Sequence, residues 1–439
     1  MHRLLAEDID DLPGLLAVTR DVALRALAGL DTRPVVAVTA PAEPDPLPDT
    51  GIGLRATLAE FQRRWEPGFS GGAGPRYLGF VTGGTTPAAL AGDWLTSAFD
   101  QNVGFAKDSS ASALEHQTVA WLGELFGLSP AHSGAFVTGS TMSNLVGLAV
   151  AREWLGERRG VSVSDTGVGA LGDVPVFSGT PHSSVYKALS VLGIGRDRMR
   201  LVPTLPGREA VDVRALAAAL ATVGGPAIVV ANAGTVNTVD FDDLPAILAL
   251  RDRFDFWLHV DGAFGAFAAL SPDHAHLVAG LDGADSVCVD LHKWLNVPYD
   301  SAVQFTRRRD LQVAVFRNTA VYLGLPNVDS PDFVHLTPES SRRLRALPAW
   351  CALSAYGRDG HRDIVERNVG SAHRLGELLA ASEHLRLLAP VRLNVVCFTL
   401  AERPTMDRVT ALVDAVTASG ETFLTPTVLD GVPGVRAAF

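Results

Sequence analysis

Short apolar runs alternate with longer amphipathic segments through the middle of the chain. The runs at 256–260, 286–289 and 302–305 are too short for helices and are rich in valine and aromatic residues, so they predict buried strands. Two further runs, at 174–177 and 227–232, have the same character. Helical periodicity lies between these runs. This alternation predicts right-handed crossovers that join the strands of one parallel or mixed sheet.

The two ends of the chain have a different pattern. Leucines and alanines recur at helical spacing over 3–29, a proline-rich connector follows, and 53–65 again has helical spacing. The other predicted elements are helices at 87–99, 113–126, 341–356, 359–381 and 406–419, strands at 385–388 and 394–400, and one final short strand. We therefore predict an N-terminal helical arm at 1–65, a large domain at 66–320 and a small α+β domain at 321–439.

The composition fits a packed globular protein. The 439 residues carry a net charge of −11, which argues against nucleic acid or an anionic membrane as a partner. The three cysteines are far apart, so they indicate neither a zinc site nor a disulfide framework. No apolar run reaches the roughly 18 residues of a membrane span, and the acidic N-terminus lacks a signal-peptide core. We expect a cytoplasmic protein.

Two charged side chains lie at the ends of predicted strands. Asp261 ends one apolar run, and Lys293 follows another on a loop, between His292 and Trp294. A lysine that forms a Schiff base and an acid that keeps a pyridine nitrogen protonated are what a pyridoxal phosphate (PLP) site requires. A salt bridge at the sheet edge is the alternative for this pair. The apolar strand and bulky neighbours around Lys293 favour a lysine withdrawn from water, and hence the cofactor site.

The segment at 134–144 has the pattern of a strand, a turn and a helix. Gly139 allows close approach of the backbone, and Ser140 and Thr141 offer hydroxyl and N–H groups at the start of the helix. Free N–H groups and the helix dipole together predict an anion site. A nucleotide-binding loop and a simple helix cap are the alternatives, and the GxGxxG spacing of the nucleotide loop is absent.

Two more polar residues follow predicted strands. His182, in the string PHSSVYKA, precedes a helix and is either a polar cap or a functional group; Thr235 follows the next strand. Ligands of α/β sheets bind at the carboxyl ends of the strands. The turn at 139–141, His182, Thr235, Asp261 and Lys293 are all expected there. This convergence predicts one site built from five loops.

The strings HVDGAFG and ADSVCVDLHKW, around Asp261 and Lys293, resemble the group II PLP-dependent decarboxylases. This fold-type-I family includes aromatic-amino-acid, glutamate and diaminobutyrate decarboxylases. The resemblance extends over roughly 33–439, with Asp290-Leu291 as a mild departure. It implies a seven-stranded, mainly parallel sheet, a small C-terminal domain, and an N-terminal arm that lies on the partner in a homodimer with shared active sites. An ordinary helix on its own domain is the alternative for the arm.

The resemblance also implies roles for individual residues. Lys293 carries PLP in this scheme, Asp261 faces the pyridine nitrogen, and His182 stacks on the ring. Further cofactor contacts are implied for Gly139, Ser140, Thr141, Thr235, Ala263 and His292. Thr82 lies in a glycine-rich stretch at 71–84, which the family uses across the dimer, and is implied to touch the substrate. A plain glycine-rich turn is the alternative.

The implied activity is decarboxylation of an L-amino acid, with aromatic amino acids among the candidates, to the amine and CO₂. The alternatives are decarboxylation coupled to oxidative deamination, which yields an aldehyde, or transamination. A non-catalytic scaffold is a further alternative, against which the intact Lys293, Asp261 and His182 argue. The sequence does not identify the side chain accepted, since the basic residues Arg76, Lys107 and Arg392 are unplaced.

One position departs from the family in a way that bears on the product. An ungapped comparison, anchored on the arginines at 342–345, sets Phe333 where the family's decarboxylases carry a tyrosine that protonates the substrate Cα. Phenylalanine has no proton to give, so His335, His182 or water must supply it. Without that proton, oxygen diverts the reaction to an aldehyde, as in family members that resemble aldehyde synthases. Tyr322 is another candidate to enter the site.

Overall fold

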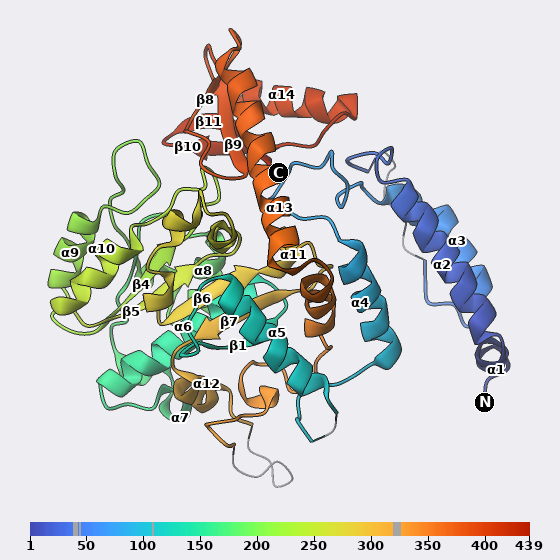
Figure 1. Cartoon of the computed structure of the whole chain (residues 1–439), viewed down its shortest axis with the longest axis horizontal. Helices are drawn as coiled ribbons and strands as arrows, with labels where there is room; N and C mark the ends of the chain where they lie inside the picture. The colour runs from blue at the N-terminus through green and yellow to red at the C-terminus, as the bar shows by residue number, and fades with distance from the viewer. Residues whose placement is uncertain (38–42, 44, 108, 319–325) are drawn as a thin grey trace.

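The computed structural model describes residues 1–37, 43, 45–107, 109–318 and 326–439. It contains a large domain with a seven-stranded sheet, a small domain with a four-stranded sheet, and an N-terminal arm (Figure 1). The strands of the large sheet are β1 (Ser133–Val137), β2 (Val176–Ser178), β3 (Met199–Leu201), β4 (Ala227–Asn232), β5 (Phe256–Asp261), β6 (Ser286–Asp290) and β7 (Ala302–Thr306).

The strands of the large sheet follow the order β1-β7-β6-β5-β4-β2-β3. All neighbouring pairs are parallel except those of β7, which runs antiparallel to both β1 and β6. The predicted fold, a mainly parallel seven-stranded sheet with a small C-terminal domain, is therefore confirmed. Asp261 at the end of β5 lies in register with Asn232 of β4 and Cys288 of β6. The carboxyl ends of these central strands thus meet at one edge.

Apolar clusters cover both faces of this sheet because successive side chains of a strand point to opposite faces. In β4, Ile228 and Val230 pack with α6 (Ser140–Arg158) and α8 (Ser183–Val191). Val229 and Ala231 belong to the larger cluster on the other face. Helices α5 (Ala111–Leu125), α9 (Val213–Ala221) and α10 (Leu244–Ala249) contribute to that larger cluster. Burial on both faces explains why the strands are continuous apolar runs.

The small domain follows a long helix, α13 (Ala346–Ala380), which runs from the large domain into it (Figure 1). Its antiparallel sheet has the order β10-β11-β9-β8. The elements are β8 (Leu385–Leu387), β9 (Val395–Leu400), α14 (Met406–Ser419), β10 (Thr425–Leu429) and β11 (Val432–Ala438). The remaining α-helices are α1 (Arg3–Asp10), α2 (Leu12–Ala28), α3 (Leu54–Arg64), α4 (Pro87–Phe99), α7 (Val163–Thr166), α11 (Leu291–Trp294) and α12 (Arg309–Phe316). Short 3₁₀ segments lie at Glu66–Gly68, Val168–Leu171, Arg196–Arg198, Leu250–Asp252, Gly265–Leu270, Ala275–Val278, Leu281–Gly283 and Phe333–His335.

Three element predictions were wrong in detail. The helix expected over 3–29 is broken at Asp11, because Pro13 in the first turn of α2 cannot continue a preceding helix. The helix expected from 341 begins at Ala346, since the preceding arginines form ion pairs with α4, α5 and nearby loops. The final strand is a hairpin, in which Asp430 and Gly431 both have positive φ, as two-residue turns require.

The helix α13 is interrupted at Gly357, where φ is 58° and ψ is −171°. This agrees with the two helices predicted around that position. Among the described residues, no helix is long and apolar enough to cross a lipid bilayer.

Candidate active site

Lys293 lies in α11, the short helix that follows β6 at the carboxyl edge of the sheet. Its Nζ is 3.5 Å from Oδ2 of Asp290, and 5.4 Å from the centre of the Phe264 ring. The other oxygen of Asp290 lies 3.1 Å from Nδ1 of His292. Burial lowers the pKa of His292, while the charge of Asp290 opposes that shift. A partly buried amine is thus held beside a buried carboxylate at the carboxyl edge of the sheet.

Asp261 ends β5 and is 7% exposed. Its Oδ1 accepts a hydrogen bond from the N–H of Ala263 at 3.2 Å, and its Oδ2 accepts one from the side-chain amide of Asn144 at 2.9 Å. Two donors on different elements therefore fix the plane of this carboxylate. The small side chain of Ala263 follows directly, and Ala263 is also buried. A fixed carboxylate beside a small residue suits the edge of a flat, protonated ring.

His182 caps the N-terminus of α8, as the interpretation of this residue as a polar cap predicts. Its Nδ1 accepts a hydrogen bond from the N–H of Ser184 at 3.2 Å and lies 2.8 Å from the Ser184 hydroxyl. Burial lowers the pKa of His182; the charge of Asp261 opposes this shift, and the charge of Lys293 adds to it. All three predicted groups are therefore close enough to act on one another.

The start of α6 lies beside the same group of residues. The N–H of Ser140 donates to Oδ1 of Asp290 at 3.2 Å, and the first N–H groups of a helix have no partner within it. Gly139 is extended, with φ of 178°. A Cβ added there would meet Cε1 of His292 at 3.7 Å, an ordinary contact, so the fold itself does not require glycine. The N–H groups at the start of this helix are the type of donor that binds an anion such as a phosphate.

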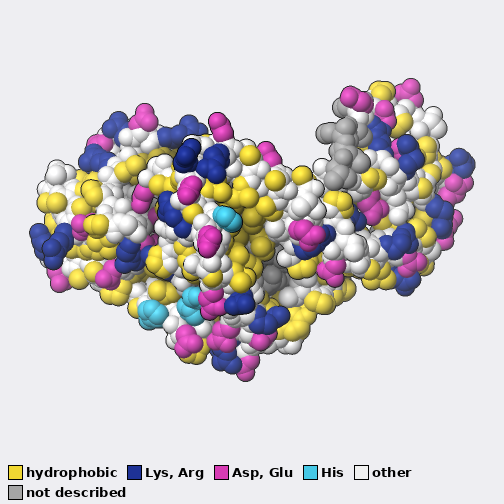
Figure 2. Space-filling view, turned by 90° about the horizontal axis from the view of Figure 1, so that it is seen from above, with side chains coloured by type: hydrophobic (Ala, Val, Ile, Leu, Met, Phe, Trp, Pro, Cys, Tyr) yellow, Lys and Arg dark blue, Asp and Glu magenta, His cyan; other side chains and the backbone are white. Residues whose placement is uncertain are grey.

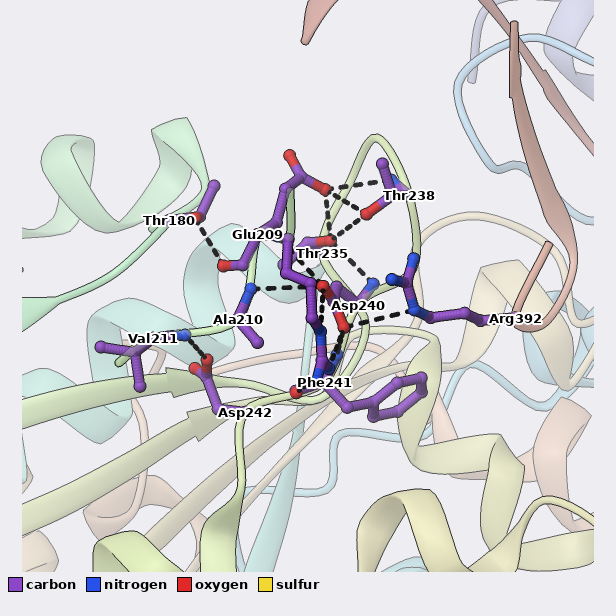
Figure 3. A network of polar contacts seen from close by, with 11 residues as sticks. Thr180, Glu209, Ala210, Val211, Thr235, Thr238, Asp240, Phe241, Asp242 and Arg392 are labelled. Atoms are coloured by element: carbon purple, nitrogen blue, oxygen red, sulfur yellow. Dashed lines mark hydrogen bonds and ion pairs between the residues drawn. The ribbon is translucent and has the colours of Figure 1, made fainter. Parts of the chain in front are cut away.

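Thr235 belongs to a tightly braced loop after β4 (Figure 3). Its hydroxyl donates to Oε2 of Glu209 at 2.6 Å, and the same oxygen accepts hydrogen bonds from the N–H and hydroxyl of Thr238. Asp240, in the same loop, pairs with Arg208 at 2.6 Å and with Arg392 at 3.4 Å. The Arg208 hydrogen bond holds the pKa of Asp240 below its usual range although burial raises it. The position of Thr235 is therefore set by buried acids that sequence reasoning did not identify.

The small domain reaches this loop directly. Arg436 of β11 donates to the carbonyl oxygen of Val236 at 2.8 Å, and Thr427 of β10 donates to the side chain of Asn237 at 2.7 Å. The charge of Arg436 also lowers the pKa of His182. An arginine within an otherwise apolar strand is a signal that could have identified this residue. No comparable feature of the sequence marks Glu209.

Thr82 and Lys293 line one pocket of about 530 Å³ between the two domains. The hydroxyl of Thr82 is buried and has no hydrogen-bond partner among the described residues. A Cβ added to Gly83 would lie 1.9 Å from the carbonyl oxygen of Lys293, so only glycine allows this approach. The glycine-rich stretch at 71–84 is thus a close packing partner of the lysine loop in the same chain.

Phe333 and His335 are not brought to this group of residues within the described part of the chain. Phe333 is fully buried, with its ring 4.5 Å from that of His116 and the Arg342 guanidinium 5.1 Å above it. His335 accepts a hydrogen bond on Nδ1 from the N–H of Asn318 at 3.1 Å. The roles expected for both residues stay predictions. Tyr322 lies outside the described residues.

The side chains at the carboxyl edge fit one cofactor. A lysine, a fixed carboxylate, a nearby imidazole and a helix N-terminus are the four features by which PLP is held. Among the described residues, no group of three or more His, Cys, Asp or Glu side chains is placed to hold a metal ion. Together with the sheet order and the small domain, the site defines a PLP-dependent enzyme of fold type I.

The chain belongs to the family described as "Pyridoxal-dependent decarboxylase conserved domain", which matches residues 31–401. An aromatic-L-amino-acid decarboxylase of Bacillus atrophaeus is 30% identical over 369 residues, which cover 81% of this chain and 75% of that protein. A phenylacetaldehyde synthase of a Rosa hybrid cultivar is 25% identical over 429 residues, which cover 91% and 82%. The crystal structure of Oryza sativa TDC with PLP and tryptamine has a TM-score of 0.89 at 23% identity, covering 98% of this chain and 93% of that one. The chain is a PLP-dependent amino-acid carboxy-lyase.

Proposed function

We propose that this enzyme decarboxylates an aromatic L-amino acid to its amine and CO₂. The observation that carries the substrate class is the set of apolar and aromatic side chains in the pocket at Lys293, namely Tyr77, Leu78, Val81, Phe264 and Trp294; polar residues such as Thr82, Asn368 and Arg367 complete its lining. Its volume of about 530 Å³ is within the range of small-molecule sites. The one charged arginine of the lining, Arg367, pairs with Asp363 at 2.9 Å. The apolar part of the pocket therefore favours an aromatic side chain over a charged one, because burying an unpaired charge is strongly unfavourable.

Two of the basic residues considered for an acidic substrate are engaged elsewhere. Arg76 donates to the carbonyl oxygen of Arg33 at 2.7 Å, and Arg392 pairs with Asp240 at 3.4 Å. Both guanidinium groups are therefore already held in part by other groups of the chain. The relative from Bacillus atrophaeus, named for aromatic L-amino acids, supports the same substrate class.

Bound PLP supplies an electron-accepting ring, which takes up the electron pair released when the substrate carboxylate departs as CO₂. We propose that Lys293 attaches the cofactor, that Asp261 holds a proton on the pyridine nitrogen, and that the start of α6 binds the phosphate. The carboxylate of Asp261 is suited to its role because Asn144 and the Ala263 N–H hold both of its oxygens. His182 and Ala263 would lie on the two faces of the ring.

The amine product requires one proton at Cα in place of the departing carboxylate. We assign this proton to His182, which feels the charges of both Asp261 and Lys293. Nδ1 of His182 is occupied by Ser184, so Nε2 is the ring nitrogen available to a substrate. Phe333, packed against His116 in its own chain, has no proton to offer.

A panel of L-amino acids tests the activity and the product together. Phenylalanine, tyrosine, tryptophan, glutamate and 2,4-diaminobutyrate are each incubated with PLP-loaded enzyme and oxygen, and CO₂, amine, aldehyde, ammonia and peroxide are measured. We expect an aromatic substrate to give amine and CO₂ in equal amounts. Equal yields of aldehyde, ammonia and peroxide instead would assign the second candidate function, the aldehyde-forming reaction, for which the phenylacetaldehyde synthase of the Rosa hybrid cultivar is named. The matched variant Phe333→Tyr should leave the product ratio unchanged; a shift towards amine would place this segment at Cα.

We further propose a two-fold homodimer with shared active sites, joined in part by the arm. The arm stands apart from the body of the chain (Figures 1 and 2). Helices α1 and α3 bury no side chain, and α2 buries Leu15 and Val22 alone. Leu5, Leu12 and Leu16 are at least half exposed, at 54%, 50% and 57%. An apolar arm of this kind needs a partner surface, and a second copy of the chain is the partner that symmetric assembly provides.

Sedimentation of the PLP-loaded enzyme should therefore give a dimer. Leu16→Asp should raise the dimer dissociation constant by about tenfold or more, the scale for losing an important apolar contact. Leu378→Asp is the matched control, because Leu378 is 54% exposed on α13 in the small domain. A wild-type chain that sediments as a monomer and is fully active at nanomolar concentration would rule out shared sites.

A further inference from the structure

A chain of fully buried polar side chains lies behind Asp261. Trp257, His259, Ser286 and Asn144 all have no measurable exposure. The Trp257 indole N–H lies 3.0 Å from Oγ of Ser286, which lies 2.7 Å from Nδ1 of His259. Nε2 of His259 lies 2.9 Å from Oδ1 of Asn144. Buried polar atoms need partners, and each of these atoms has one.

The charge of Asp261 determines the direction of each hydrogen bond in this row of polar side chains. A carboxylate only accepts hydrogen bonds, so the NH₂ group of Asn144 must face Asp261, at 2.9 Å. Oδ1 of Asn144 then faces His259 and must receive a hydrogen from Nε2. Neutral His259 has one N–H, so its Nδ1 accepts from the Ser286 hydroxyl, and Ser286 accepts from Trp257. Every donor meets one acceptor, and the chain ends on Asp261.

The second hydrogen of the same amide starts a second branch. Nδ2 of Asn144 also donates to Oγ of Ser184 at 3.0 Å. The hydroxyl of Ser184 can then donate to Nδ1 of His182, 2.8 Å away, where the Ser184 N–H also donates. Nδ1 of His182 therefore carries no hydrogen while the ring is neutral. Its one N–H is Nε2, the nitrogen that faces away from this network.

We infer that Asn144 is a positioning residue for two groups at once: it orients the Asp261 carboxylate and, through Ser184, keeps the proton of His182 on Nε2. The chain from Trp257 through Ser286 and His259 holds the amide of Asn144 in the orientation that both roles need. This inference rests on the proposed function of His182 and Asp261. The inference explains why the His182 imidazole presents a proton to the substrate. The proposed function requires such a donor because Phe333 has no proton to give.

The backbone near His259 is shaped for this contact. Gly147 lies one turn after Asn144 in α6, and a Cβ added there would be 2.7 Å from Cε1 of His259. That distance is shorter than side chains tolerate, so only glycine lets the imidazole approach the helix this closely. Burial lowers the pKa of His259 to about 4, against the opposing charge of Asp261, so the ring is neutral at physiological pH.

The test compares Asn144→Ala, Ser184→Ala and His259→Phe with wild type. The matched control is His361→Phe, because His361 is 1% exposed, lies on α13 and has no hydrogen-bond partner for either ring nitrogen within the described part of the chain. Two quantities are measured: the PLP dissociation constant, and the ¹⁵N shifts of the His182 ring, which report which nitrogen carries the proton. Activity as kcat and KM is recorded alongside them.

We expect Asn144→Ala and His259→Phe to weaken PLP binding about 10- to 100-fold, the range for losing a group that orients a ligand-binding residue. Ser184→Ala should leave PLP binding within about twofold, but lower kcat and weaken the preference of His182 for Nε2–H, which the backbone N–H of residue 184 alone would then support. His361→Phe should change neither quantity. Wild-type PLP affinity in His259→Phe, or an unchanged His182 tautomer in Asn144→Ala, overturns the inference. If no amino acid releases CO₂, the proposed function fails, yet the binding and NMR results still decide the role of Asn144.

Acid unfolding of the His259→Phe variant tests the same inference independently. The folded-state pKa of His259, about 4, lies below its ordinary value of 6.5, so its stabilising contribution is complete above pH 6.5 and is lost as the pH falls towards about 4. Asp261 is the charged group that acts on this ring. His259→Phe should therefore lose less stability between neutral pH and pH 4 than wild type, since the other buried histidines are common to both. Equal acid sensitivity would show that this chain of buried side chains does not hold His259 neutral.

Discussion

Replacement of Lys293 by alanine should reduce turnover by roughly 10³-fold or more, because removing a covalent nucleophile is among the largest losses a single residue can cause. The lysine amine lies at the carboxyl edge of the sheet, 3.5 Å from Asp290, and no other lysine is near it in the sequence. The chain has three lysines, Lys107, Lys187 and Lys293. A covalent cofactor label can therefore be assigned without ambiguity.

The measurement is borohydride reduction of the PLP-loaded protein, followed by mass spectrometry of its peptides. The label should be found on the peptide that contains Lys293, and the visible absorbance of the bound cofactor should disappear in Lys293→Ala. Lys187→Ala is the control, since Lys187 is exposed on α8. Retention of both the reducible linkage and turnover in Lys293→Ala would show that the site has been assigned to the wrong residue.

Replacement of Asp261 by alanine should lower kcat on the order of 10²-fold or more, the scale for removing one preorganised electrostatic partner. PLP should still bind, although more weakly, because Lys293 and the start of α6 remain. The loss should appear in kcat, since the charge of Asp261 matters most when the ring takes up electrons. Asn144 would also lose one of its acceptors, so the preference of His182 for Nε2–H should weaken in this variant.

Steady-state kinetics with the preferred substrate, at saturating PLP, provide the measurement. Asp407→Ala, at the exposed start of α14, controls for loss of an aspartate far from the site. Near-normal kcat in Asp261→Ala would move the role of pyridine partner to another residue. Together with Lys293→Ala, this variant separates attachment of the cofactor from its activation.

Local elements were predictable where one physical effect dominated the pattern. The strand at 227–232 and the helices at 87–99 and 406–419 agree with β4, α4 and α14 at both ends. In β4 every side chain is buried, so a continuous apolar run marks its bounds. The hairpin of β10 and β11 was missed although Asp430-Gly431 is a strong turn signal, because the short strands around it alternate weakly.

The sequence by itself determined the fold class and the residues from which the cofactor is predicted. Strands end at Asp261 and before Lys293, and parallel strands bring such ends to one edge whatever the loops between them do. Periodicity and strand ends are local properties, set within a few residues. For that reason they can be recognised in the amino-acid sequence alone.

Only the tertiary structure decided which groups support the site. Asn144 meets His259 across 115 positions and Asp261 across 117, and Arg436 meets Val236 across 200. No spacing rule links residues so far apart, because their contacts depend on how helices and the small domain pack on the sheet. The same packing places the Phe333 ring 4.5 Å from that of His116, a contact that its position in the sequence did not predict. The reacting groups are thus determined by local pattern, and their orientation by long-range packing.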